Sequence, residues 1–168
     1  MRVACVLVTH LRARVELKRQ PHLAQTPAVI VDRSGSRTLV VDSLPAARGV
    51  LAGMTLGQAL SRQAETAVID ADEPAYRRAF RGMLTSLLAV GDRVEESDLG
   101  TAYVRLDGLQ KLYRGEAGIV CALINSLPAY MAPRIGVADA KFPALVAART
   151  APTPVSYTHL TLPTKRIV

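Results

Sequence analysis

The stretch VEESDLGTAYVRLDGL, Val94–Leu109, is the part of the chain richest in side chains that could bind a metal ion. Its four carboxylates are Glu95, Glu96, Asp98 and Asp107. Carboxylate oxygens are the ligands that Mg²⁺ prefers, and paired magnesium ions support phosphoryl transfer. Such a site needs ligands held to within about 0.5 Å on neighbouring elements. The middle of the stretch instead offers Gly100 and Thr101, so the question is whether a metal site exists here at all.

Histidines and cysteines offer no alternative set of ligands. His10, His22 and His159 are scattered singly, which is typical of surface or packing residues. Cys5 and Cys121 lie in apolar runs, and no CxxC or Cys/His spacing indicates zinc. We expect both thiols to be buried, which is consistent with a reducing compartment.

The elements that would position these residues predict an α+β fold. Apolar and β-branched runs predict strands over residues 3–8, 28–32, 38–42, 66–70, near 94, over 102–106 and over 133–138. Periodicity and capping residues predict helices over 11–18, 56–63, 72–90, 116–127 and 141–150. Without the mixed region after the first strand, the order is βαββαβ, the ferredoxin-like arrangement. We therefore expect an antiparallel sheet with helices on one face.

Composition favours a soluble, intracellular globular protein. The chain has 168 residues, of which 49% are hydrophobic and 21% charged, and no apolar run reaches the roughly 18–20 residues that cross a bilayer. The tail, residues 151–168, is rich in Thr and Pro and is predicted to be unstructured. Its letters VSYTHLTLPTKRIV resemble a translated adapter, so we interpret it as non-native. An ordinary unstructured terminus is the alternative.

Charge is unevenly distributed along the chain, whose net charge is +7. Residues 9–69 and 110–150 are basic, whereas residues 70–109 hold more acids than bases. Basic flanks around an acidic centre indicate a polyanionic partner, although solvated faces of unequal sign would give the same pattern. The low aromatic content, 4%, argues against a single-strand binder that works by base stacking.

Four blocks in order resemble the Y-family (UmuC/DinB-type translesion) DNA polymerases. They are VELKRQPHLAQTPAVIV at 15–31, GVLAGMTLGQAL at 49–60, the acidic stretch at 94–109, and RIGVADAKFPALVAA at 134–148. The resemblance implies a ferredoxin-like palm from residues 1–8 and 70–150, with a small fingers insert at 9–69. It also implies that the native protein continues into a thumb and a little finger, which this chain does not include.

The same resemblance identifies the positions where the family holds its two metal ions. The first-strand aspartate falls at Leu7 and the second aspartate of that motif at Thr9, while the acidic pair falls at Gly100 and Thr101. We therefore expect no catalytic residues, no metal site and no cofactor, since Mg²⁺ is expected only where the polymerase site is intact. Selective loss of these carboxylates is similar to the catalytically degenerate ImuB-type branch, a pseudoenzyme of SOS mutagenesis.

That branch implies an adaptor role in DNA repair and damage tolerance. The basic side chains expected to touch phosphates are Arg12, Arg14, Arg33, Arg37 and Lys141. The expected partners are DNA, bound weakly and without sequence preference, and other mutagenesis-complex subunits and the sliding clamp, bound through regions missing here. No membrane partner is expected, and the resemblance implies a bacterial cytoplasmic, nucleoid-associated location.

Two other interpretations stay open at this point. An active translesion polymerase could use displaced carboxylates, of which Asp98 is nearest; on a strand it would lie about 6–7 Å from Gly100, on the same face. A ferredoxin-like protein-interaction domain without a DNA role would use the sheet or the insert as its partner surface. A nucleotide-cyclase palm is disfavoured because it needs the same missing carboxylates.

Overall fold

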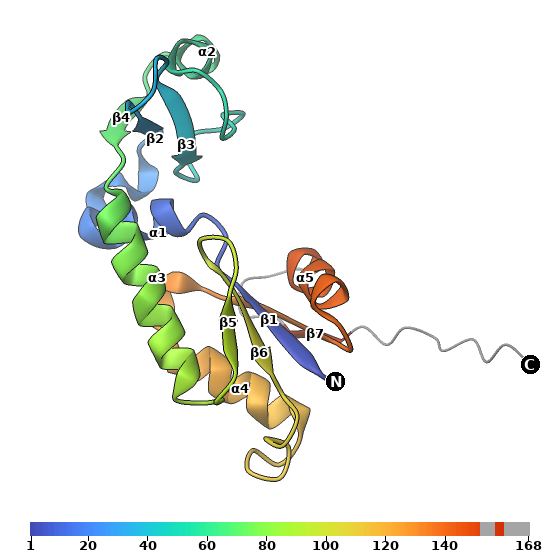
Figure 1. Ribbon diagram of the computed structural model, residues 1–168. Helices are drawn as coiled ribbons and strands as arrows, with labels where there is room; N and C mark the ends of the chain where they lie inside the picture. The colour runs from blue at the N-terminus through green and yellow to red at the C-terminus, as the bar shows by residue number, and fades with distance from the viewer. Residues whose placement is uncertain (152–156, 160–168) are drawn as a thin grey trace, which may run out of the picture. The chain divides into compact units, whose positions relative to one another are not determined.

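The computed structural model describes residues 1–151 and 157–159 (Figure 1). The chain forms two compact units. Unit 1 contains Met1–Thr9 with Phe80–Val168, and unit 2 contains His10–Ala79. All of the expected fingers insert except Thr9 falls in unit 2. The assignment of palm and fingers to these exact residue ranges stays a prediction.

Unit 1 contains the larger sheet. Its elements are β1 (Val3–Leu7), the second half of α3 (Glu73–Leu88), β5 (Val94–Glu96), β6 (Thr101–Arg105), α4 (Glu116–Ser126), the short helix η2 (Ala129–Met131), β7 (Arg134–Ala138), α5 (Lys141–Thr150) and β8 (Tyr157–His159). The strand order is β5-β6-β1-β7-β8. β1 pairs antiparallel with both β6 and β7. This is the order that a βαββαβ core gives, so the predicted α+β fold class is confirmed.

One face of this sheet is apolar and closed. Along β1, Ala4 and Val6 are fully buried, and so are their register partners on β6 and β7. Figure 1 shows α4 and the second half of α3 on this side of the sheet. Met83 and Leu87 of α3 and Leu123 of α4 are fully buried, as the core of a half-covered sheet requires.

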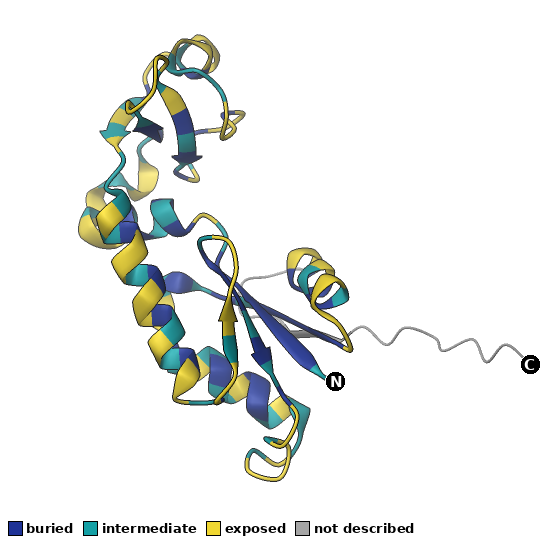
Figure 2. Ribbon diagram, viewed as in Figure 1, coloured by how far each residue is buried: buried dark blue, intermediate teal, exposed yellow. Residues whose placement is uncertain are grey.

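The opposite face, here called the α5 face, is covered only in part. Cys5, Leu7 and Ala138 form a buried cluster with Ala144 and Ala148 of α5. The expectation of helices on one face only was therefore wrong. α5 can approach because Gly136, in the middle of β7, has no side chain: a Cβ there would lie 2.2 Å from the Ala144 carbonyl oxygen. Beyond β1 this face is open, and Figure 2 shows exposed residues along β5.

Unit 2 contains a second, three-stranded sheet. Its elements are α1 (Leu11–Arg19), the short helix η1 (Pro21–Gln25), β2 (Ala28–Asp32), β3 (Leu39–Ser43), α2 (Leu56–Arg62), β4 (Ala67–Asp70) and the start of α3. The strand order is β3-β2-β4, with β2 and β4 parallel. A capping box formed by Thr55 and Gln58 begins α2, and the Asp72 carboxylate begins α3 by accepting from the backbone N–H of Ala75.

The tail differs from its prediction at three residues. Tyr157–His159 form β8, which adds a parallel strand to β7. The outer edge of β7 offers unpaired backbone groups, and an extended segment can satisfy them. The rest of the predicted tail after Ala151 lies outside the described residues. In the described part of the chain, no helix is both long and apolar enough to cross a membrane.

Candidate functional site

The four positions singled out by the sequence lie together at one end of the α5 face. Leu7, the last residue of β1, pairs in register with Thr101, the first residue of β6. The Val8 N–H donates to the Gly100 carbonyl oxygen at 2.8 Å. Thr9 is the second residue after β1. The fold therefore brings these positions together, as a metal site would require, but the side chains there are not metal ligands.

Leu7 lies in an apolar environment. It is 8% exposed and packs in the cluster of Cys5, Ala138, Ala144 and Ala148. Thr101 is also buried, at 7% exposure. A carboxylate placed among these groups would lose its hydration without gaining a charged partner from the cluster. The surroundings of Leu7 have therefore become hydrophobic core.

Gly100 lies in the turn that joins β5 to β6. Its φ angle is +87°, a left-handed conformation that glycine adopts without steric cost. The turn is closed by the Thr101 N–H, which donates to the Asp98 carbonyl oxygen at 2.8 Å. The displaced-carboxylate alternative considered Asp98 on a strand, on the same face as Gly100, but Asp98 is not in a strand. Asp98 is exposed in the turn, because β5 ends at Glu96.

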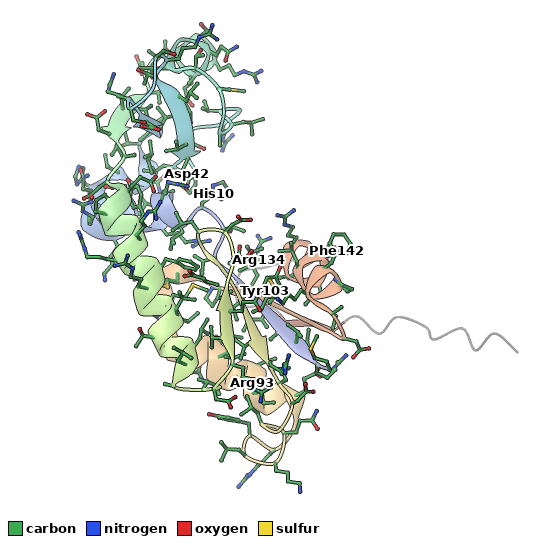
Figure 3. All side chains as sticks on the ribbon, viewed as in Figure 1. His10, Asp42, Arg93, Tyr103, Arg134 and Phe142 are labelled. Carbon is green, nitrogen blue, oxygen red and sulfur yellow. The ribbon has the colours of Figure 1, made fainter. Side chains whose placement is uncertain are left out.

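A positively charged side chain, that of Arg134, lies next to these positions on β7. Arg134 begins β7 and pairs in register with Leu7, so its side chain belongs to the α5 face. Its Nη1 donates to the Arg149 carbonyl oxygen in the last turn of α5, at 3.4 Å. Its Nε is buried without a hydrogen-bond partner. Figure 3 labels Arg134 beside α5. A guanidinium here raises the local positive potential, which disfavours a divalent cation.

These residues do not fit a magnesium site. A row across the three strands is formed by Leu7 of β1, Thr101 of β6 and Arg134 of β7, and it contains no carboxylate. The nearest acid of the turn, Asp98, is exposed. Within the described ranges, no three His, Cys, Asp or Glu side chains cluster closely enough to hold a metal ion. Near-octahedral oxygen coordination of Mg²⁺ cannot be built from this set.

Comparison with known proteins identifies the family. The sequence model described as the impB/mucB/samB family matches residues 8–149. The chain belongs to this family. No curated protein matches the chain.

Solved structures share the fold of this family member. DinB from Sulfolobus solfataricus has a TM-score of 0.81 at 21% sequence identity, covering 95% of this chain and 48% of that one. An insertion ternary complex of Dbh DNA polymerase has a TM-score of 0.81 at 20% identity, covering 96% and 49%. The fold is therefore that of the Y-family polymerase palm and fingers. The chain spans about half the length of these solved structures.

Three of the five side chains predicted to touch phosphates are already engaged in ion pairs. Arg12 Nε lies 2.7 Å from Glu73 Oε1, and Arg33 Nε lies 2.6 Å from Asp70 Oδ1. Lys141, the first residue of α5, pairs with Glu95. Such pairing reduces the charge each side chain offers to a ligand. Their role in phosphate binding stays a prediction.

The other two predicted side chains, Arg37 and Arg14, lie in different parts of unit 2. Arg37 is exposed in the loop between β2 and β3 and forms no ion pair with a described residue. Arg14 lies on α1 and lines a pocket of about 290 Å³ with His10 and Ser43. In Figure 3, His10 lies against Asp42, and its Nδ1 is 2.6 Å from Asp42 Oδ1. These basic side chains therefore do not form one common site in unit 2.

Sequence reasoning missed a basic pocket on the open half of the α5 face. It has a volume of about 420 Å³ and is lined by Met1, Val3, Arg93, Glu95, Tyr103, Arg105 and Lys141. Burial raises the pKa of the Tyr103 hydroxyl, whose ring lies 5.7 Å from Lys141 Nζ. The available signal was alternation: Tyr103 and Arg105 are two apart on β6 and so point to one face.

Proposed function

We propose that this chain is the palm and fingers of a non-catalytic Y-family relative that binds DNA during damage tolerance. The observation that carries the proposal is the carboxylate-free row formed by Leu7, Thr101 and Arg134 at the family's metal positions. Family membership supports the link to DNA repair and translesion synthesis. The net charge of +7 supports binding to a polyanion.

Nucleotidyl transfer uses two divalent cations. One ion activates the attacking hydroxyl and the other neutralises the charge that develops on the phosphates. A site of one leucine, one threonine and one arginine supplies neither ion with anionic ligands. The chain would then contribute binding and positioning, while a separate polymerase performs the synthesis. This adaptor role resembles that of the ImuB-type branch, with the contacts to that polymerase and to the sliding clamp made by other regions. It would act in the bacterial cytoplasm, at the nucleoid.

Primer extension and DNA binding, measured together, test the proposal. The chain is incubated with a labelled primer–template, nucleotides, and Mg²⁺ or Mn²⁺, and its affinity for the same DNA is measured by anisotropy at several salt concentrations. We expect no extension, and an affinity that falls steeply as salt rises because phosphate contacts release counterions.

The two parts of the proposal fail separately. Extension by the wild-type chain that disappears in Asp98→Ala would overturn the non-catalytic assignment and favour displaced carboxylates. No DNA binding even at low salt would overturn the DNA role and favour a protein-interaction domain. Affinity that ignores salt would contradict phosphate contacts as the mode of binding.

A further inference from the structure

We infer that the pocket of about 420 Å³ on the open half of the α5 face is a phosphate-binding site in which Arg93 and Arg105 hold a phosphodiester group of a nucleic-acid strand. The inference rests on the proposed function for the strand itself. It adds a specific site, made of residues that neither the family model nor the solved structures assign.

The two arginines face each other across neighbouring strands. Val94 pairs with Val104, and the Arg105 N–H donates to the Arg93 carbonyl oxygen at 3.0 Å. Arg93 is therefore opposite Arg105, and both side chains line the same pocket. Like charges placed directly opposite on two strands cost roughly 0.2–1 kcal/mol. Packing gives no reason for such a pair.

No acid of the described chain relieves this repulsion. Neither Arg93 nor Arg105 forms an ion pair or side-chain hydrogen bond with a described residue. The one carboxylate that lines the pocket, Glu95, is bound by Lys141. The pocket thus contains a neutralised pair and two further guanidinium groups. An anion bridging Arg93 and Arg105 would convert their repulsion into attraction.

The chemistry of guanidinium selects a phosphate as that anion. Its planar N–H groups fit two phosphate oxygens at once, and two guanidinium groups can share one phosphate. Arg105 ends β6, and Arg93 directly precedes β5 and accepts the backbone hydrogen bond of Arg105. This pairing restrains the backbone of both residues, which lowers the cost of ordering them. Arg93 lies on the β5 side of the sheet in Figure 3, away from the labelled Arg134. The pocket is therefore separate from the row that contains Leu7.

Charge-neutral substitutions test the pocket. The variants are Arg93→Gln and Arg105→Gln, and the matched control is Arg81→Gln, an exposed arginine on α3 of the same unit. Affinity for a labelled 20-nucleotide single strand and for its duplex is measured from 50 to 200 mM salt. Each pocket variant should weaken binding by roughly fivefold and reduce the salt slope by about 1, because one phosphate contact is lost. Arg81→Gln should change affinity less than twofold.

Each outcome either supports or overturns the inference. Equal losses in all three variants, or no loss in the pocket variants, would overturn the pocket while leaving the DNA role intact. No DNA binding by the wild-type chain would overturn the proposed function itself. In a second arm with dTTP alone, binding that is lost only in the pocket variants would overturn the strand assignment in favour of a free nucleotide. Circular dichroism melting of each variant verifies that affinity changes do not reflect unfolding.

Discussion

The two halves of the α5 face share one sheet but contain very different residues. Under α5, the face carries Cys5, Leu7, Gly136 and Ala138, which are small or apolar and nearly all buried. On the open half it carries Arg93, Glu95, Tyr103, Arg105 and, at its border, Lys141. The first set is explained by the close approach of a helix. In the second set, Tyr103 packs against the Cys5 and Leu7 cluster, but the charged side chains are not explained by packing. They therefore mark the half that is available to a ligand.

A count of basic residues is a poor guide to a binding site in this molecule, because many of them are paired with acids. In unit 2, Arg12, Arg19 and Arg33 each pair with an acid of the same unit. Exposed pairs of this kind add little stability, typically 0–1 kcal/mol, but they occupy the cation. In the open half of the α5 face, Arg93 and Arg105 face each other instead.

The largest loss of stability is expected for a substitution on the covered half, at Gly136. A Cβ there would lie 2.2 Å from both the Ala144 oxygen and the Ala148 nitrogen of α5. Gly136→Ala should lower the free energy of unfolding by about 3 kcal/mol, because α5 must move away from β7. The matched control is Gly82→Ala, at an exposed position of α3, where a Cβ meets nothing within 4 Å. It should raise the free energy of unfolding by about 1 kcal/mol. Urea unfolding measures both; equal effects would contradict the close approach.

A second test concerns Leu7, at the end of the covered half. Leu7→Asp restores the acid that the resemblance implies at this position, but it places a carboxylate among Cys5, Ala138 and Ala144. We expect a loss of about 2–3 kcal/mol in the free energy of unfolding, because apolar burial is lost and a charge is desolvated, a cost that the neighbouring Arg134 offsets only in part. Leu7→Met, which conserves volume, should cost less than about 1.5 kcal/mol. Added Mg²⁺ should leave the stability of Leu7→Asp unchanged; a clear rise would show that the row still holds a metal.

Sequence alone predicted the elements of this fold well and its faces less well. Every strand and α-helix from β1 to α5 was expected within a few residues, because the apolar runs and caps are local signals. The short helices η1 and η2 were not expected. The placement of α5 opposite the other helices was not expected. It depends on the contact of Gly136 with a helix that begins five residues later, and a lone glycine in a strand does not reveal which element approaches it.

The candidate site was predictable only at the residues that fall on motif positions of the family. Leu7, Thr9, Gly100 and Thr101 were identified together because they fall on motif positions, and the register of β1 with β6 brings them together. Arg93 and Arg105 were missed because they lie twelve residues apart and meet only through the β5–β6 pairing. The ion pairs of Arg12 and Arg33 were equally invisible, since their partners, Glu73 and Asp70, lie far along the chain.

The cysteines allow a third test, of burial on the covered half. Burial raises the pKa of the Cys5 thiol to about 12, partly offset by Arg149. The native state therefore keeps a proton that the unfolded chain loses, so the unfolding free energy should fall as pH rises from about 9 toward 12. At pH 10 the Cys5 thiol lowers the unfolding free energy by roughly 1–2 kcal/mol in this way. Cys5→Val should flatten this fall. The control is Cys121→Val, because Cys121 was expected to be buried but is exposed. An identical pH profile in both variants would show that Cys5 is not buried as described.

The smallest effect should come from the open half, and it should have the opposite sign. Arg105→Thr removes one of two like charges that face each other, and threonine suits a strand. The free energy of unfolding should therefore rise by about 0.5 kcal/mol at low salt, and the gain should shrink as salt screens the pair. Arg81→Thr on α3 is the control. It should give no net gain, because relief of the repulsion from Arg77, four residues earlier on the helix, is offset by the poor helix propensity of threonine. A variant that is more stable yet binds DNA less well would mean that the pair is kept for binding, at the expense of stability. A loss of stability in Arg105→Thr would instead mean that Arg105 supports the fold, and the contrast between the two halves would then be one of packing alone.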